Sequence, residues 1–343
     1  MHDDRPLAEA PSPPAGIRPR TLWLAIFALV LLGSALIAWL LLREAPSATD
    51  RLTPFSAEST TTVSLAGRFP RPGEGSLSRP LGLAGDGEVI YVALGGQGAI
   101  AIFDYEGNRE GTITIPPAPG RTVSSPVDIA IMNDGRLGVV DTAGSRVIIV
   151  DPERPRERPV EFASEEGTDA PVSPTAIARA GGAVYVADSS DHSVREYTIN
   201  GTFRRRLEFD APGLSFVGGL TATQDDVYVA DSNAGRGVIV DRETARQTGT
   251  LSNQLELPRG IAINERGEIW VAEMFGRRIL LFDPAGQTVL NVIGDGEDED
   301  IPEGDMLQSP ESILWDDETS RLYVSDTVSG CICVYNVRRE VAE

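Results

Sequence analysis

The chain of 343 residues contains no lysine, because all 30 of its basic residues are arginine. Without lysine, mechanisms that need a Schiff base or the phosphate-binding lysine of a P-loop are excluded. The two histidines, His2 and His192, are too few for a metal site built from several histidines of one chain. Acidic residues number 51, which gives a formal net charge of −21 and argues against a nucleic-acid binder with a basic surface.

Aromatic residues make up only 6% of the chain, whereas 35 glycines and 24 prolines supply many turns. This composition argues against a helical bundle or coiled coil and favours short strands joined by turns. The only two cysteines, Cys331 and Cys333, occupy alternate positions of an expected strand. Because such side chains rarely suit a disulfide, we interpret them as buried thiols, with a redox pair or soft-metal site as the alternative.

One long apolar run, Leu22–Leu42, carries no charge and is followed directly by Arg43. At roughly 1.5 Å per residue, its length matches a bilayer core of about 30 Å. Trp23 and Trp39 lie near its ends, where interfacial aromatic residues belong. We therefore interpret residues 21–43 as a transmembrane helix that serves as an uncleaved anchor, with a cleaved signal peptide as the alternative.

The orientation of this anchor follows from its flanking arginines, three before the run and two after it. This positive-inside bias favours a cytoplasmic N-terminus and places the remaining chain outside the cytoplasm. Residues 1–20 contain five prolines and are interpreted as a disordered cytoplasmic tail, and residues 44–57 as a linker. The sequence thus predicts a single-pass membrane protein with an extracytoplasmic folded part.

Six segments of that folded part repeat the same order of features. A proline or turn precedes a short apolar strand, then comes a strand of the form Tyr-Val-Ala-Asp, then a strand rich in Ile and Val. In the third repeat these are 174–178, 184–188 and 194–197. The repeats begin near residues 80, 126, 174, 217, 258 and 310. A recurring unit of four short strands, every 40–50 residues or so, is typical of a β-propeller blade.

The ends of the repeat array predict how the ring closes. The sixth repeat ends after its third strand, and the segment 60–65 before the first repeat has the character of a strand. If this segment completes the last blade, it pairs an edge that would otherwise be open. We therefore predict an all-β, six-bladed β-propeller over residues 58–339.

The sequence of these repeats resembles that of the NHL repeat family. The resemblance rests on the recurring Pro-x-Gly/Asp-Ile-Ala, on Val-Ala-Asp/Glu followed by an arginine-containing turn as in 271–283, and on glycine-rich approaches at 73–80 and 304–310. It covers nearly all of 58–339 and implies a six-bladed propeller, but it does not specify a function. WD repeats are disfavoured because Gly-His and Trp-Asp pairs do not recur.

Candidate site residues are sought where the repeats differ, at the channel mouth formed by loops that lead into the innermost strands. Asp128, Thr175, Arg259 and Glu311 are the polar residues expected to converge there as a ligand-binding site. The alternative is a set of ordinary solvated residues that includes an Arg259–Glu311 pair between neighbouring blades. The repeated aspartates, by contrast, are interpreted as residues that hold turns through backbone amides: 141, 188, 231 and 326.

Two classes of function fit these observations. The first is a binding or scaffold module for an extracytoplasmic protein, peptide or glycan, joined to the membrane through Leu22–Leu42 and without nucleic acid as a partner. The second is a metal-dependent propeller enzyme, a lactonase-like hydrolase or a lyase, with its site at the channel mouth. Resemblance to the peptide-amidating lyases implies zinc held by several histidines, and only His192 lies in this domain.

A lactonase-type site would need a carboxylate, an amide and a second carboxylate around its metal. Asp128 and Glu311 could contribute to such a site, but no asparagine occupies a corresponding mouth position. We therefore favour binding and predict no catalytic residue, metal ligand or cofactor. A structural or channel divalent cation is left open.

Overall fold

The computed structural model describes residues 59–341, apart from 72, 156, 158, 163–170, 252–253 and 295–305. The expected tail, the transmembrane helix at 21–43 and the linker at 44–57 lie outside the described residues. A search of the described residues for a helix long and apolar enough to cross a membrane finds none.

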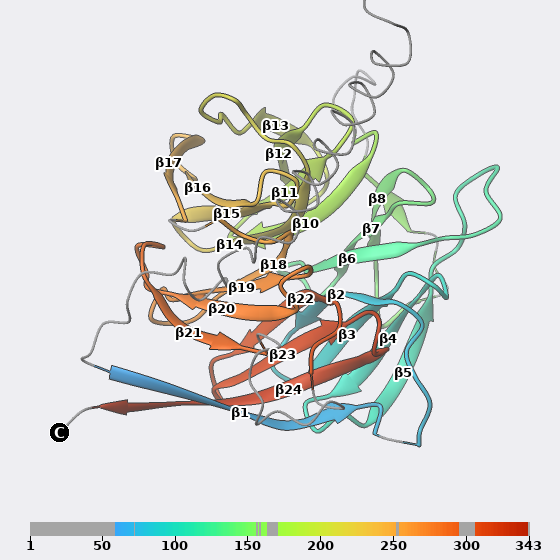
Figure 1. Cartoon of the computed structure of the whole chain (residues 1–343). Helices are drawn as coiled ribbons and strands as arrows, with labels where there is room; N and C mark the ends of the chain where they lie inside the picture. Colours follow the sequence, from blue (N-terminus) through green and yellow to red (C-terminus); the bar gives the residue numbers. More distant parts are fainter. Residues whose placement is uncertain are drawn as a thin grey trace, which may run out of the picture. The chain divides into compact units, whose positions relative to one another are not determined.

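Strands of the described chain form six four-stranded antiparallel sheets (Figure 1). The first three sheets are built from β2 (Pro80–Gly85), β3 (Val89–Leu94), β4 (Ala99–Asp104) and β5 (Arg109–Thr114); β6 (Pro126–Ile131), β7 (Leu137–Asp141), β8 (Arg146–Val150) and β9 (Val160–Glu161); and β10 (Pro174–Ala180), β11 (Ala183–Asp188), β12 (Ser193–Thr198) and β13 (Phe203–Arg206).

The next two sheets are built from β14 (Val217–Ala222), β15 (Asp226–Asp231), β16 (Arg236–Asp241) and β17 (Arg246–Thr250); and β18 (Pro258–Ile263), β19 (Ile269–Glu273), β20 (Arg278–Phe282) and β21 (Val289–Ile293). The innermost strand of each sheet contacts that of the next, and the innermost strand of the sixth sheet contacts β2. The sheets therefore form a closed ring, which confirms the predicted six-bladed β-propeller.

The sixth blade combines both ends of the domain. It contains β22 (Pro310–Asp316), β23 (Arg321–Asp326) and β24 (Cys331–Val341), and its outermost strand is β1 (Ser59–Phe69). β1 pairs with β24 along its whole length, with Ser59 opposite Val341 and Phe69 opposite Ile332. The two strands continue past the end of β23, where Asn291 donates a hydrogen bond to the carbonyl of Thr61 over 2.6 Å. The first strand thus removes the open edge of β24.

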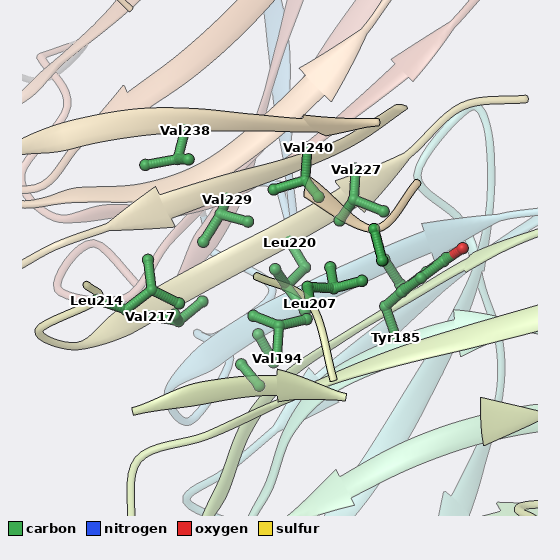
Figure 2. Close-up of a cluster of buried hydrophobic side chains, with 14 of the residues drawn as sticks. Tyr185, Val194, Leu207, Leu214, Val217, Leu220, Val227, Val229, Val238 and Val240 are labelled. Carbon is green, nitrogen blue, oxygen red and sulfur yellow. The ribbon is translucent and has the colours of Figure 1, made fainter. Parts of the chain in front are cut away.

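The core consists of six apolar clusters, one at each interface between neighbouring blades. Figure 2 shows the cluster between blades 3 and 4, where Tyr185 and Val194 of one blade meet Val227 and Val240 of the next. Successive side chains of a strand point to opposite faces of the sheet. Each blade therefore contributes side chains to two clusters, one on each of its faces. The second strand carries an aromatic residue in every blade except blade 2, and these residues are buried in this way: Tyr91, Tyr185, Tyr228, Trp270 and Tyr323.

A buried carboxylate ends the second strand in blades 2 to 6. In blade 4, Asp231 accepts hydrogen bonds from the amides of Ser215 and Phe216, both over 3.0 Å, and from Arg236 Nε over 3.1 Å. The amides belong to the loop that leads into the blade, and the arginine opens the third strand. Equivalent ion pairs join residues 141 and 146, 188 and 195, and 273 and 278.

Blade 6 keeps the carboxylate but not the arginine. Asp326 accepts hydrogen bonds from the amides of Gln308 and Ser309, and the residue opposite it is Cys331. The Sγ atoms of Cys331 and Cys333 lie 3.9 Å apart, and both cysteines are buried free thiols, which confirms the interpretation made from their spacing.

Close packing of the innermost strands leads to a first prediction, for Gly219 in β14. A Cβ atom at this position would lie 1.9 Å from the carbonyl oxygen of Arg259 in β18. We expect Gly219→Ala to lower the free energy of unfolding by about 1–3 kcal/mol, because the neighbouring backbone must move. Denaturant unfolding of the full chain measures the change.

The matched control is Gly182→Ala, because a Cβ atom at Gly182 would meet nothing within 4 Å. It should leave stability unchanged or slightly raised. Equal stabilities of the two variants would contradict the close approach of β14 and β18.

Candidate ligand-binding site

The six innermost strands surround a central cavity of about 390 Å³. We call the face at which these strands begin the upper face. The loops on it are those from each fourth strand to the next blade and those between second and third strands. The residues that line the cavity extend along the innermost strands, from Arg79, Thr175, Arg259 and Glu311 near the upper face to Arg179 and Trp315 near the opposite face. We call the end of the cavity at the upper face the upper mouth.

A β-bulge lies near the start of every innermost strand. The register with the second strand shifts between Pro126 and Asp128 in blade 2, and at the equivalent point in the five other blades. Bulges twist a strand locally and re-aim its side chains, and they occur often beside functional sites. The third position of each innermost strand lies at this shift, and these positions form a ring that is filled by Gly82, Asp128, Ala176, Gly219, Gly260 and Ser312. Asp128 is therefore the one titratable side chain in a ring of small residues.

Asp128 holds two blades together through backbone amides. Its Oδ2 accepts a hydrogen bond from the amide of Ile177 in β10 over 2.8 Å, and its Oδ1 accepts one from Ile129 over 3.0 Å. On its other side, a Cβ atom at Gly82 would lie 2.6 Å from Oδ1, so the carboxylate fills the space that glycine leaves. Desolvation inside the ring raises the pKa of Asp128 to about 7. The amide hydrogen bonds and the positive charge of Arg259 act in the opposite direction, but their effect is smaller.

Arg259 and Glu311 form an ion pair between blades 5 and 6. The Nε atom of Arg259 lies 2.7 Å from Oε2 of Glu311, and the two side chains are 23% and 11% exposed. The guanidinium also lies over the ring of Phe216, 6.0 Å from its centroid. None of the described residues accepts a hydrogen bond from the two terminal nitrogens of Arg259. The pair thus fixes one edge of the guanidinium and leaves the other edge for a ligand.

Hydroxyl groups at the mouth are occupied by backbone partners. Thr175 Oγ1 donates a hydrogen bond to the carbonyl of Val217 over 2.8 Å, and Thr327 Oγ1 donates one to that of Pro80 over 2.8 Å. Ser312 Oγ accepts a hydrogen bond from the amide of Leu83 over 3.1 Å. These groups join blade 3 to blade 4 and blade 6 to blade 1.

The four residues singled out from the sequence therefore line one cavity, but they differ in what they can offer a ligand. Asp128 and Thr175 are engaged with backbone groups of the neighbouring blade, and Glu311 is engaged with Arg259. Arg259 alone keeps hydrogen-bond donors that no described residue uses. The ion pair that the sequence suggested as an alternative is present, and it still leaves donors free.

Sequence reasoning missed Arg79, which also lines the cavity. It precedes Pro80, at the position held by serine, phenylalanine or leucine in the other blades, and it has a φ of 53°. No described residue forms an ion pair or hydrogen bond with its exposed side chain. An arginine at a repeat position that is otherwise uncharged was the available signal.

Sequence reasoning also missed an apolar rim around the mouth. Val123, Val172, Phe275 and Val328 are 61–70% exposed, and all four lie on loops of the upper face. The fifth exposed large apolar residue among those described is Val160, on the outer strand β9. A single exposed valine has no significance, but four on the loops of one face distinguish that face from the rest. We call these four residues the apolar rim.

The metal ligands weighed from the sequence do not gather at the mouth. Within the described ranges, no group of three or more His, Cys, Asp or Glu side chains could hold a metal ion. Asp128 and Glu311 come from blades 2 and 6, with blade 1 between them. His192 is exposed on the loop between β11 and β12 and does not line the cavity.

The raised pKa of Asp128 predicts a pH dependence of stability. Between its ordinary value of 3.8 and about 7, the folded state keeps a proton that the unfolded chain has lost. The free energy of unfolding should therefore fall as pH rises through this window, with a slope of at most about 1.4 kcal/mol per pH unit. Asp128→Asn should remove the contribution of this residue to the pH dependence. Any destabilisation that the substitution itself causes should be the same at every pH.

Urea unfolding of the wild type and of Asp128→Asn at pH 4 to 8 measures this difference. The control is Asp134→Asn, since Asp134 is exposed and hydrogen bonds to Arg136 lower its pKa. Identical pH slopes for the wild type and Asp128→Asn would show that Asp128 is ionised across the whole range.

Comparison with known proteins extends this picture only to the fold. No family model and no curated protein matches the chain. A catalytically inactive histidine-to-alanine variant of virginiamycin B lyase from Staphylococcus aureus, solved with quinupristin, has a TM-score of 0.56 at 12% identity, over 77% of this chain and 82% of that one. A streptogramin B lyase structure has a TM-score of 0.55 at 13% identity, over 85% of this chain and 91% of that one.

A Bacteroides thetaiotaomicron protein of unknown function has a TM-score of 0.60 at 13% identity, over 82% of this chain and 77% of that one. At such low identity, all of these similarities show a shared six-bladed propeller and nothing of activity. Membership of the NHL repeat family stays a prediction.

Proposed function

We propose that this chain is a binding module whose upper face takes up a protein or peptide. The observation that carries the proposal is that the apolar rim and the upper mouth lie on the same face of the propeller. Exposed apolar side chains beside a polar opening are typical of a recognition surface, in which apolar contacts supply affinity and polar groups supply orientation.

A peptide suits this surface better than a glycan. Three of the four rim residues are valines, and only Phe275 is aromatic. Valine buries against aliphatic side chains, whereas it lacks the flat face on which a sugar ring would stack. Glycan binding is therefore an outcome of the test and not part of the proposal.

We further propose that the repeats are of the NHL type and that residues 21–43 anchor the chain, with the propeller outside the cytoplasm. The support is the uncharged run of Leu22–Leu42, its flanking arginines and the repeated motif text. β1 enters the domain at the end of the sheet away from the upper face, because Ser59 pairs with Val341 at the far end of β24. Attachment through β1 thus leaves the upper face available to a partner.

The second candidate function is a lyase, favoured by the fold shared with the two lyase structures. The inactive variant of one of them lacks a histidine, and the cavity of this chain is lined by none. Incubation of the full chain with quinupristin, followed by liquid chromatography, separates the two candidates. A new product formed by the wild type would favour the lyase and overturn the binding role.

Truncation of the apolar rim gives the test of the binding proposal. The full chain, purified in mild detergent, is used to select binders from a displayed library of random dodecapeptides, and the enriched peptides are synthesised. We expect Phe275→Ser and Val328→Ser each to weaken their binding at least fivefold, because each removes an apolar contact of about 1–2 kcal/mol.

The matched control for these variants is Val160→Ser, which removes from β9 a valine that is 54% exposed. Its binding should stay within twofold of the wild type. Failure to enrich any peptide, or an equal loss in Val160→Ser, would contradict the proposal; enrichment on an oligosaccharide array instead would replace the peptide by a glycan.

A further inference from the structure

The charge at the upper mouth is opposite in sign to that of the chain. The chain carries −21 overall, whereas the cavity is lined by three arginines, Arg79, Arg179 and Arg259, and by two carboxyl groups, those of Asp128 and Glu311. Three guanidinium groups against two carboxyl groups leave at least one unit of positive charge. A local cation in an acidic protein attracts anions only at short range, because charges beyond about 8 Å are screened at physiological salt.

Arg259 is held in the orientation that a planar anion needs. Glu311 accepts from Nε over 2.7 Å, and the ring of Phe216 lies on one side of the guanidinium, so the group is fixed without use of its terminal nitrogens. These nitrogens carry four N–H donors in a rigid plane. Such an edge matches the two oxygens of a carboxylate, which accept from it in parallel.

The nearby Glu311 sets the charge of the ligand that can be accepted. Its carboxylate is only 11% exposed and lies beside the guanidinium, so a bound anion is close to a second negative charge. A monoanion is balanced by the one net positive charge of the mouth, whereas a dianion such as phosphate is left with an unpaired charge. A carboxylate therefore fits this site better than phosphate.

We propose that the upper mouth is a carboxylate-binding subsite, in which the terminal nitrogens of Arg259 hold one carboxylate of a bound peptide and Arg79 supplies a second cation. This inference rests on the proposed function, since the peptide is the ligand that brings the carboxylate. Glu311 is a positioning residue: it orients Arg259 and excludes dianions. The apolar rim then contacts the residues next to that carboxylate.

The probes for this subsite are N-acetyl-Val-Phe with a free carboxylate and the same dipeptide as its C-terminal amide. Binding of each to the full chain is measured by ligand-observed NMR. We expect the acid to bind at least tenfold more tightly than the amide. Arg259→Gln should remove that preference, Arg79→Gln should reduce it threefold or more, and Arg121→Gln should leave it unchanged. Arg121 is an exposed arginine on an upper-face loop that does not line the cavity.

Glu311→Gln is the variant that keeps the test decisive if Arg259→Gln fails to fold. The amide oxygen of glutamine still accepts from Nε of Arg259, but the negative charge is gone. The acid should bind threefold or more tightly to Glu311→Gln than to the wild type, and inorganic phosphate should begin to compete with it. A merely structural role for Glu311 would leave the preference for the acid unchanged.

The results also separate this inference from the proposed function. Equal binding of acid and amide, absence of binding by either probe at millimolar concentration, or a loss in Arg121→Gln equal to that in Arg259→Gln overturns the subsite. If Phe275→Ser still weakens the selected peptides in that case, the binding module stands without it. Competition by phosphate against the wild type as strong as that by acetate would show a general anion site, which also overturns the proposal.

Discussion

The upper face depends on one interaction, the buried carboxylate at the end of the second strand. In blades 2 to 5 it accepts hydrogen bonds from amides of the preceding loop and pairs with an arginine of the third strand, as Asp231 does with Ser215, Phe216 and Arg236. Burial of an ion pair is costly, and it is offset only when every lone pair and proton finds a partner. The amides and the arginine meet that condition together. If the loop moved, the carboxylate would lose its amide hydrogen bonds, and the buried ion pair would no longer be compensated. The start of the innermost strand in these four blades, with its bulge, is thereby fixed, and so is the part of the mouth that these strands form.

The blades that depart from this pattern are the two beside the closure of the ring. Blade 1 has Leu94 and Ala99 in place of the pair, and blade 6 has Asp326 opposite Cys331. These blades also contribute Arg79 and Glu311 to the mouth. Blade 6 is also the blade that β1 completes, and the pairing of β1 with β24 holds its third strand from the outer side.

The fold could be predicted from the sequence because the same pattern of strands and turns recurs in every blade of a propeller. Tyr-Val-Ala-Asp and its variants mark a second strand that is buried on both faces in every blade, and the period between them defines the blade. Position in the repeat also predicted that Asp128, Thr175, Arg259 and Glu311 line one cavity. The sequence also suggested the Arg259–Glu311 ion pair, whereas the partners of Asp128 could not be predicted. The hydrogen bond that Asp128 accepts from the amide of Ile177 depends on a bulge that leaves no mark in the pattern of apolar residues. The apolar rim lies on loops, where periodicity carries no information about exposure.

The size of the cavity decides how the rim and the mouth share recognition. A volume of about 390 Å³, much of it flanked by the small residues of the bulge ring, accommodates one side chain or a chain terminus but no folded partner. In the complex that we propose, a protein partner inserts a single group and rests on the loops for the remainder of its contact. The inserted group would meet the fixed guanidinium of Arg259 and set the register of the complex, whereas Phe275 and the valines of the rim would contribute area without direction. The polar mouth and the apolar rim would thus act on one partner in different ways.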